Sequence, residues 1–254
     1  MRQKAIVGLR GLLKNRVYTV RNGLAKGLRR KGGLGFLPKR MTAEQLLVRK
    51  QDFRGKVLYD IGGWEGVFTL FFARAAQPGG QVVTFEPNPD NRRIIQENLE
   101  LNGFQNVTIR PVALGQVARR AALAVSRNTG TGTIHEQRKG RNLGQPGART
   151  HEVEVDTVDH QIEAYHLPSP DFVKIDVEGM ELEVLVGMEG TIRRVKPRIL
   201  VEVHECGPEG DAENAKRVVE WLESRNYTLM HVESEQAVSC AYATQVSKQH
   251  LYCT

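Results

Sequence analysis

The sequence has few of the features that mark disulfide-bonded, secreted or membrane-spanning proteins. Its three cysteines, Cys206, Cys240 and Cys253, are an odd number without the spacing of a metal site, which fits a reducing compartment. No uncharged apolar run approaches the ~18–20 residues that a membrane-spanning helix needs. Arg10 and Lys14 interrupt the apolar stretch near the start, which argues against a signal peptide. We therefore expect a cytoplasmic protein.

Acidic residues are absent from the first 40 positions. Residues 1–40 carry 12 of the 36 lysines and arginines and no aspartate or glutamate, so the remainder carries 24 basic and 29 acidic residues. The apolar residues of this segment lie three or four positions apart: Ile6, Leu9, Leu13, Val17, Val20, Leu24 and Leu28. This spacing predicts an amphipathic helix. Such a helix could pack on the domain, lie peripherally on an anionic membrane or contact nucleic acid.

From residue 41 onward, strand-like and helix-like segments alternate. Strands are expected at 56–61, 81–86, 107–109, 171–176, 198–204, 227–232 and 249–253, and helices near 65–76, 89–102, 179–188 and 212–225. This alternation is typical of a parallel sheet covered on both faces. Residues 115–155 interrupt it and are expected to form a β-hairpin and loop insert. We therefore expect a basic amphipathic extension at 1–40 and one domain at 41–254.

The turn after the first of these strands has the pattern D-x-G-x-x-x-G, from Asp60 through Gly62 to Gly66. A dinucleotide fingerprint needs G-x-G-x-x-G, but Trp64 and Val67 occupy positions where glycines should be. An acid beside a pyrophosphate would repel it, whereas an acid beside an aminoacyl ammonium would attract it. The turn therefore favours S-adenosylmethionine over a nicotinamide dinucleotide.

The end of the second strand carries Glu86, followed by Pro87 and Asn88. Ligands of open α/β sheets bind at the carboxyl ends of the strands. A carboxylate there can accept hydrogen bonds from both hydroxyls of a ribose, and the rigid Pro87-Asn88 turn could border an adenine. The alternative is that Glu86 caps the helix that follows.

Two later strands also end in polar residues. Lys174, Asp176 and Glu178 alternate along one strand, and Glu202 and His204 end the next. Asp176 could hold the ammonium of the cofactor, an acceptor hydroxyl or a metal ion. His204 is the leading candidate for a general base, because the unperturbed pKa of histidine lies near neutrality; the alternative is a structural histidine. These side chains also suit a divalent metal, but no ligand spacing specifies one.

These blocks together resemble the FkbM-type methyltransferases, a class I group associated with O-methylation of natural-product and glycan hydroxyls. The similar blocks are Val57–Thr69, Val82–Pro89, Asn98–Gly103, Pro111–Gly115, Phe172–Gly179 and Ile199–His204. The resemblance implies an α/β, Rossmann-like class I methyltransferase fold with a mostly parallel seven-stranded sheet, helices on both faces and an antiparallel C-terminal strand. It also implies a cofactor pocket lined by Asp60, Gly62, Gly66, Glu86 and Ala113. One departure is Trp64, where a small polar residue such as Asn is more usual.

The resulting prediction is an S-adenosylmethionine-dependent methyltransferase of EC 2.1.1 type that acts on a hydroxyl of a glycan, lipid-linked or natural-product acceptor. An RNA methyltransferase guided by the basic N-terminal segment is one alternative. However, amine methylation usually leaves Asn/Asp-Pro-Pro-aromatic where this chain has Asp176-Val177-Glu178-Gly179, and acidic groups there suit phosphates badly. The other alternative, a non-catalytic membrane-associated binding module, does not account for Asp60 and Glu86.

Overall fold

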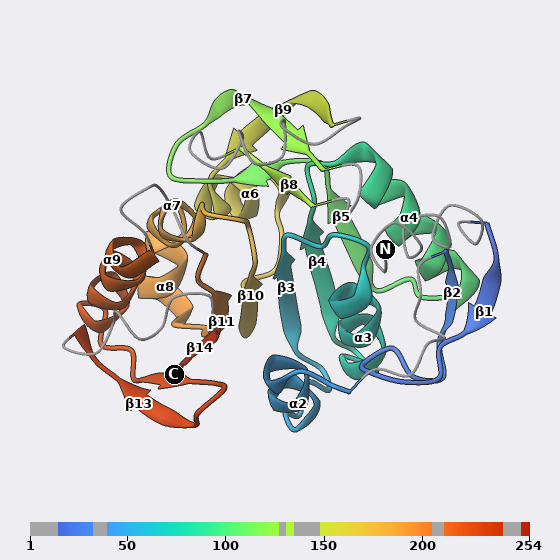
Figure 1. The fold of residues 1–254 in the computed structure, drawn as a ribbon, viewed down its shortest axis with the longest axis horizontal. Coiled ribbons are helices and arrows are strands. Elements are labelled where there is room, and N and C mark those ends of the chain that lie inside the picture. Colours follow the sequence, from blue (N-terminus) through green and yellow to red (C-terminus); the bar gives the residue numbers. More distant parts are fainter. Residues whose placement is uncertain (1–14, 33–39, 127–130, 135–147, 205–210, 241–249) are drawn as a thin grey trace, which may run out of the picture.

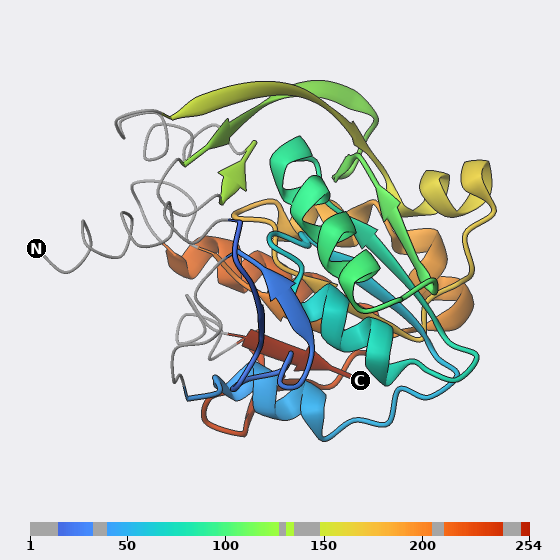
Figure 2. The same ribbon diagram turned by 90° about the vertical axis from the view of Figure 1, so that its right-hand side faces the viewer.

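The computed structural model describes residues 15–32, 40–126, 131–134, 148–204, 211–240 and 250–254. They form one large sheet with helices on both faces (Figure 1). A smaller sheet arches over the large one, as the rotated view makes clear (Figure 2). Within the described residues, no helix combines the length and the apolar character that crossing a membrane would require.

The large sheet has the strand order β13-β12-β14-β11-β10-β3-β4-β5. The bounds are β3 (Val57–Ile61), β4 (Gln81–Phe85), β5 (Val107–Arg110), β10 (Phe172–Ile175), β11 (Arg198–Glu202), β12 (Leu229–His231), β13 (Gln236–Val238) and β14 (His250–Cys253). Strands β5, β4, β3, β10 and β11 are parallel, whereas β14 is antiparallel to both neighbours. The sequence predicted seven strands, but the described sheet has eight. The addition is β13, whose three residues are too few to show a period of two.

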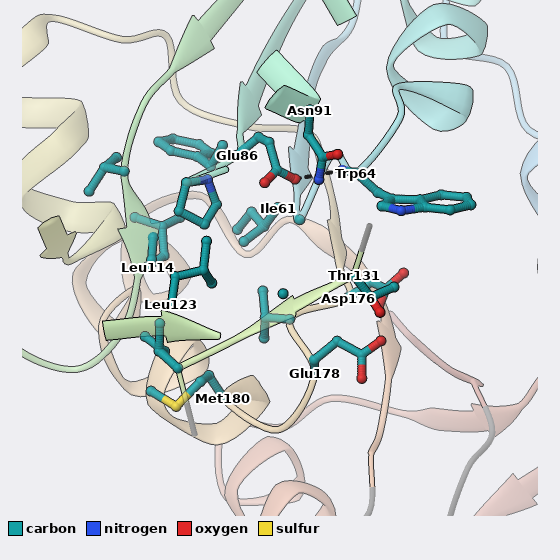
Figure 3. A pocket seen from close by; sticks show the side chains of 18 of the residues that line it. Ile61, Trp64, Glu86, Asn91, Leu114, Leu123, Thr131, Asp176, Glu178 and Met180 are labelled. Atoms are coloured by element: carbon teal, nitrogen blue, oxygen red, sulfur yellow. Dashed lines mark hydrogen bonds between the residues drawn. The ribbon is translucent and has the colours of Figure 1, made fainter. Parts of the chain in front are cut away.

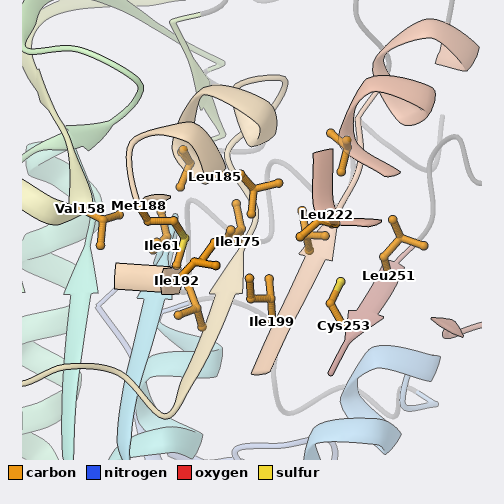
Figure 4. Packing of buried hydrophobic residues seen from close by; sticks show 14 of the residues in the cluster. Ile61, Val158, Ile175, Leu185, Met188, Ile192, Ile199, Leu222, Leu251 and Cys253 are labelled. Atoms are coloured by element: carbon orange, nitrogen blue, oxygen red, sulfur yellow. The ribbon is translucent and has the colours of Figure 1, made fainter. Parts of the chain in front are cut away.

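Helices cover both faces because side chains alternate along each strand. On one face lie α2 (Ala43–Arg49), α3 (Val67–Ala75) and α4 (Pro89–Leu101), and on the other α6 (Val158–Tyr165), α7 (Glu181–Val186), α8 (Glu189–Val195) and α9 (Asp211–Glu223). Figure 4 shows the core of the second face, where Ile61, Ile175 and Ile199 pack beneath Met188 and Leu222. All five side chains are fully buried or nearly so. This rigid core fixes where the strands end.

Residues 15–32 do not form the helix that the sequence predicted through Leu28. Strand β1 (Val17–Thr19) pairs antiparallel with β2 (Arg29–Lys31). Between them, Gly23 and Gly27 have φ angles of 80° and 85°, which lie in the left-handed region and exclude a right-handed helix. The prediction was therefore wrong for this segment. Its first part lies outside the described residues: Ile6, Leu9 and Leu13.

Three of the four described apolar residues that suggested the helix are nevertheless buried, whereas Val17 is 40% exposed. Val20, Leu24 and Leu28 are at most 8% exposed and pack with the side chains of α3 and α4. The side chain of Asn102 fixes the segment to α4, because it accepts from the Arg29 N–H and donates to the Arg29 carbonyl, both at 2.8 Å. Here the apolar residues three or four positions apart are buried by a turn between two strands, and not by one face of a helix.

The smaller sheet has the order β6-β9-β7-β8. Its strands are β6 (Ala113–Leu114), β7 (Arg119–Val125), β8 (Gly132–Thr133) and β9 (Arg149–Asp156). β7 and β9 pair antiparallel along their length, and their inner side chains join one apolar cluster with the start of α7. That cluster includes Ala113, Leu123, Ile134, Val153 and Met180. The described part of residues 115–155 therefore packs on the domain as a sheet.

Candidate active site

Four parallel strands end in one row. The pairing registers of β4, β3, β10 and β11 place one residue from each strand end side by side: Glu86, Gly62, Asp176 and Glu202. Backbone hydrogen bonds continue into this row, since the Gly62 N–H donates to the Phe85 carbonyl and the Asp176 N–H to the Ile61 carbonyl. The carboxyl edge of the sheet is therefore where polar groups from distant parts of the sequence meet.

The turn after β3 leaves no space for side chains at two of its glycines. Gly62 has a φ of 84°, and a Cβ atom added there would lie 1.9 Å from the Asp176 carbonyl oxygen. Gly66 has a φ of 78°, and its added Cβ would lie 2.9 Å from the Ile95 side chain. Both positions therefore require glycine. The result is a tightly packed turn whose backbone itself forms part of the site wall.

Asp60 lies beneath this turn rather than on the surface of the site. Its side chain is fully buried, and its Oδ2 accepts a hydrogen bond of 2.6 Å from Thr69 Oγ1. Its Oδ1 lies 3.8 Å from Lys174 Nζ and has no hydrogen-bond partner within the described part of the chain. Burial raises the pKa of Asp60, and the Lys174 ammonium and the Thr69 hydrogen bond oppose the shift.

Glu86 is held by two backbone donors and by the side chain of Asn91. Its Oε2 accepts from the Trp64 N–H at 2.7 Å and its Oε1 from the Asn88 N–H at 2.8 Å. Arg92 fixes the backbone turn that follows, because its guanidinium donates to the carbonyls of Glu86 and Pro87. Burial raises the pKa of Glu86 to about 7, although the hydrogen bonds favour its ionised form. A carboxylate has about four lone-pair sites, and because three donors use them, one site remains for a ligand.

A cavity of about 260 Å³ lies along the row of strand ends. Its lining residues are Ile61, Gly62, Trp64, Phe85, Glu86, Pro87, Asn91, Val112, Ala113, Leu114, Leu123, Thr131, Gly132, Ile134, Asp176, Val177, Glu178, Met180, Glu202 and His204. Figure 3 shows two different sides, with Leu114 and Leu123 on one and Trp64, Asp176 and Glu178 on the other. Within the described part of the chain, no lysine or arginine lines the cavity. We call these two sides the apolar end and the acidic end.

At the acidic end, Lys174 acts on Asp176 from behind the wall. Lys174 is 5% exposed, and its Nζ lies 3.2 Å from Asp176 Oδ2. Burial would raise the pKa of Asp176, but the charges of Lys174 and His204 outweigh it and the pKa is lowered. Asp176 therefore stays ionised and faces the cavity.

His204 is surrounded by carboxylates. Its Nδ1 lies 2.9 Å from an oxygen of Glu181, which is fully buried. Its Nε2 lies 3.4 Å from Glu202 and 3.8 Å from both Asp176 and Glu178. Burial disfavours the charged ring, but the hydrogen bond to Glu181 and the surrounding negative charges outweigh it and raise the pKa of His204 to about 9. The ring is therefore protonated at neutral pH in the absence of ligands.

The smaller sheet forms part of the cavity wall. Leu123 of β7 and Ile134, just after β8, contribute to the lining. The hydroxyl of Thr133 donates a hydrogen bond of 2.9 Å to the Glu178 carbonyl, which ties the sheet to the acidic end. Glu178 has a φ of 55°, a conformation that is uncommon for residues other than glycine and that occurs preferentially at functional sites.

Three side chains at the acidic end could together hold a metal ion. Asp176, Glu202 and His204 each offer one ligand atom, and these atoms lie within 4.8 Å of one another. A second such group, Glu44, Glu233 and His250, is outside the cavity lining. Three protein ligands are enough for an ion that completes its coordination with substrate or water.

Comparison with known proteins places this site in a family. Residues 59–229 match the model of the methyltransferase FkbM domain. The chain is 31% identical over 176 residues to "Methyltransferase 1" of Beauveria bassiana, covering 64% of this chain and 70% of the relative. It is 29% identical over 148 residues to the hexuronic acid methyltransferase AglP of Haloferax volcanii, covering 58% and 56%. The chain thus spans little more than half of this second relative.

The chain belongs to the FkbM methyltransferase family. The predicted family and the predicted methyltransferase class of enzyme, EC 2.1.1, are thereby confirmed at the level of the family. The fold agrees with solved structures. A methyltransferase FkbM from Methylobacillus flagellatus matches with a TM-score of 0.51 at 16% identity, over 81% of this chain and 45% of that one. A putative rRNA-methylase from Clostridium thermocellum matches with a TM-score of 0.50 at 13% identity, over 85% and 96%.

Most of the residues that the sequence singled out line the cavity of this FkbM methyltransferase. They are Gly62, Glu86, Pro87, Ala113, Asp176, Glu178, Glu202 and His204. Asp60, Gly66 and Asn88 do not. Asn88 instead holds Glu86 through its N–H and begins α4 by accepting a hydrogen bond from the Asp90 N–H. These three residues support the site from behind.

Sequence reasoning did not assign a site role to several residues of this FkbM methyltransferase. Leu123, Ile134 and Met180 line the cavity through the packing of the smaller sheet, for which no local motif exists. Glu181 orients His204 from the first turn of α7. An acid in the first turn of a helix ordinarily indicates only a favourable helix start, so its partner could not be inferred.

Proposed function

We propose that this chain transfers a methyl group from S-adenosylmethionine to a hydroxyl oxygen of a glycan, lipid-linked or natural-product acceptor. The observation that carries the proposal is the row of strand ends, in which Glu86 and Asp176 face one cavity on either side of the Gly62 turn. Family membership and the name of the Haloferax relative support a methyl transfer to a sugar-like acceptor.

The residues around Glu86 fit S-adenosylmethionine. Glu86 can still accept a hydrogen bond from a ribose hydroxyl, and Pro87 and Ala113 provide apolar contacts for the adenine. The Gly62 turn has space for backbone contacts alone. Asp60 supports this turn from beneath through its hydrogen bond with Thr69. When bound, the cofactor supplies a methyl group carried on positively charged sulfur.

The acidic end would position the acceptor and take up its proton. As the oxygen forms its bond to the methyl carbon, the bond from that carbon to sulfur breaks and the sulfur keeps the electron pair. The oxygen loses a proton, which needs an acceptor within reach. Asp176 can align the hydroxyl by accepting its hydrogen bond, and alignment of this kind can contribute ~7–11 kcal/mol to catalysis. We assign the role of proton acceptor to His204, through Nε2.

The state of His204 sets a pH requirement for this role. Its pKa is raised to about 9, so only a minor fraction of the ligand-free protein has a neutral ring at pH 7. A nearby cationic sulfur favours the neutral form and lowers this pKa. We therefore expect kcat/KM to rise with pH and to level off above about 9. A profile that stays flat from pH 6 to 10 would exclude His204 as the base.

The decisive experiment combines cofactor binding with methyl transfer. Calorimetric titration with S-adenosylmethionine should show one site, and Glu86→Ala should lose it. Radiolabelled methyl groups should then enter the glycan or lipid fractions of a cell extract, with protein and RNA fractions as alternatives. Exclusive labelling of RNA or protein would overturn the glycan, lipid-linked or natural-product acceptor, and failure of the wild-type protein to bind the cofactor would overturn the proposal as a whole.

A further inference from the structure

The charges at the acidic end and the position of Trp64 specify the acceptor more closely. We infer that the acceptor is an uncharged sugar, held between the Trp64 indole and the carboxylates of Asp176, Glu178 and Glu202, and that sugars bearing a carboxylate are rejected. This inference rests on the proposed function, because it assigns a substrate class to the same cavity.

Among the residues that the structure describes, no lysine or arginine side chain lines the cavity to receive an anionic acceptor. Lys174 is behind the wall, where it lies 3.2 Å from Asp176 and 3.8 Å from Asp60. His204 lines the cavity, but its charge is shared among Glu181 at 2.9 Å and further carboxylates within 3.8 Å. A uronate or a phosphate at this end would therefore meet net negative charge.

Hydroxyl groups suit the same wall. A carboxylate accepts hydrogen bonds but donates none, so Asp176, Glu178 and Glu202 need donors from any ligand that displaces water from them. Neighbouring hydroxyls of a sugar are donors and can satisfy two oxygens at once. A uronate carboxylate is itself an acceptor, so it cannot donate a hydrogen bond to these side chains. Its negative charge is also repelled by theirs.

Trp64 gives a second, independent indication of a sugar. It has a φ of 46°, a rare conformation for a bulky residue, and its N–H is bonded to Glu86. Its side chain lines the cavity and extends on the same side as Asp176 and Glu178 (Figure 3). The flat, apolar face of an indole packs against the C–H face of a pyranose ring, while the hydroxyls at the rim of the ring reach polar partners.

Matched pairs of sugars test the inference. The intact chain is incubated with radiolabelled S-adenosylmethionine and the methyl glycosides of glucose, galactose and mannose, each beside its uronate. We expect label in at least one neutral sugar, with kcat/KM at least about 100-fold above that of its uronate, because each ionised carboxylate near the acceptor contributes on the order of tenfold or more. Equal or preferred use of a uronate overturns the inference and leaves methyl transfer to sugars standing.

Two other outcomes also overturn it. If the protein binds the cofactor and labels lipids, RNA or protein but no sugar in the panel, the assigned substrate class is wrong. If a uronate is labelled only when Mg²⁺ or Mn²⁺ is added, and a chelator abolishes this, a metal ion at Asp176, Glu202 and His204 determines the charge preference instead. Absence of cofactor binding would count against the proposed function itself.

Variants separate charge from shape. Glu178→Gln keeps the size of the side chain but removes a negative charge, so the preference for the neutral sugar should fall about tenfold. Glu163→Gln makes the same change on the exposed face of α6 and should leave the preference unaltered. An unchanged preference in Glu178→Gln would mean that charge does not select the acceptor.

The role of Trp64 is tested by Trp64→Asn and Trp64→Phe. Asparagine tolerates the left-handed backbone, so the N–H bond to Glu86 should persist, and the cofactor dissociation constant should change less than about twofold. The KM for the neutral sugar should rise about tenfold in Trp64→Asn and return most of the way in Trp64→Phe. Equal loss of cofactor affinity and sugar affinity would mean that the indole does not face the acceptor.

Discussion

Glu86 and Asp176 are both carboxylates at the ends of parallel strands, yet their surroundings shift their pKa values in opposite directions. Glu86 is buried beside apolar residues, and burial raises its pKa to about 7. Asp176 lies against the ammonium of Lys174, which with His204 lowers its pKa despite burial. The strand ends therefore fix where the two carboxylates lie. Whether a buried cation such as Lys174 lies beside a carboxylate determines how readily that carboxylate ionises.

The two ends of the cavity therefore respond to different ranges of pH. The apolar end loses the charge of Glu86 as the pH falls through about 7. The acidic end gains a neutral His204 only as the pH rises towards about 9. Cofactor binding and acceptor activation should be separable by pH and by mutation, and four predictions test this separation.

The largest effect is expected from Glu86→Ala. A hydrogen bond from a ribose hydroxyl to a carboxylate is worth about 1.5–3 kcal/mol, so the affinity for S-adenosylmethionine should fall by about 10- to 100-fold. Calorimetric titration at pH 8 measures this. The control is Glu100→Ala on the exposed face of α4, and this variant should bind S-adenosylmethionine normally. Retained affinity in Glu86→Ala would place the ribose elsewhere.

Glu181→Gln should alter the acidic end alone. Glu181 raises the pKa of His204 through a hydrogen bond and its charge, so its neutralisation should lower the pH at which kcat/KM levels off. We expect a shift of about one pH unit, which is about a tenfold gain in neutral His204 at pH 7. Cofactor affinity should be unchanged.

The control for that variant is Glu183→Gln. Glu183 is two residues away on α7 but pairs with Arg119 at 3.1 Å, so its neutralisation should leave the pH profile in place. Thermal stability as a function of pH gives a second measurement. The folded-state pKa of His204 is raised, so its contribution to stability is fully present below about 6.5 and is lost as the pH rises through about 9. Glu181→Gln should therefore lower the melting temperature more at pH 7 than at pH 10.

At the apolar end, cofactor affinity itself should depend on pH. In the proposed complex, Glu86 accepts a ribose hydroxyl best when it is ionised, and its pKa is about 7. The dissociation constant should therefore rise as the pH falls, by about fivefold between pH 7 and pH 6. Titrations across this range measure it. A constant affinity from pH 8 to pH 5.5 would show that the protonated acid binds equally well.

The comparison also explains what the sequence could predict. Gly62, Glu86, Asp176 and Glu202 follow buried apolar strands, and parallel strands bring their carboxyl ends to one edge. The site row was therefore accessible from local patterns. The segment from Val20 to Leu28 was not, because its spacing of apolar residues fits a helix and a turn equally well, and only the left-handed glycines distinguish them.

The chemistry within the row depended on contacts between distant segments. Sequence reasoning chose His204 for a pKa near neutrality, but Glu181, which lies 23 positions earlier, raises that pKa. Leu123 reaches the cavity through β7–β9 pairing across residues that are distant in the chain. Neither contact follows from periodicity or motif, because both arise only when the two segments are packed in three dimensions.

The smallest effect is expected from the hydrogen bond that ties the smaller sheet to the acidic end of the cavity. The Thr133 hydroxyl donates to the Glu178 carbonyl, so Thr133→Val, which keeps the shape, should cost about 1 kcal/mol in the free energy of unfolding. Thr150→Val on the exposed part of β9 should cost less than half of this. Because Glu178 lines the cavity at the proposed acceptor position, the KM for the acceptor should rise about threefold while cofactor affinity stays constant. Equal changes in both constants would mean that the smaller sheet positions the whole cavity, and that its ends are not independent.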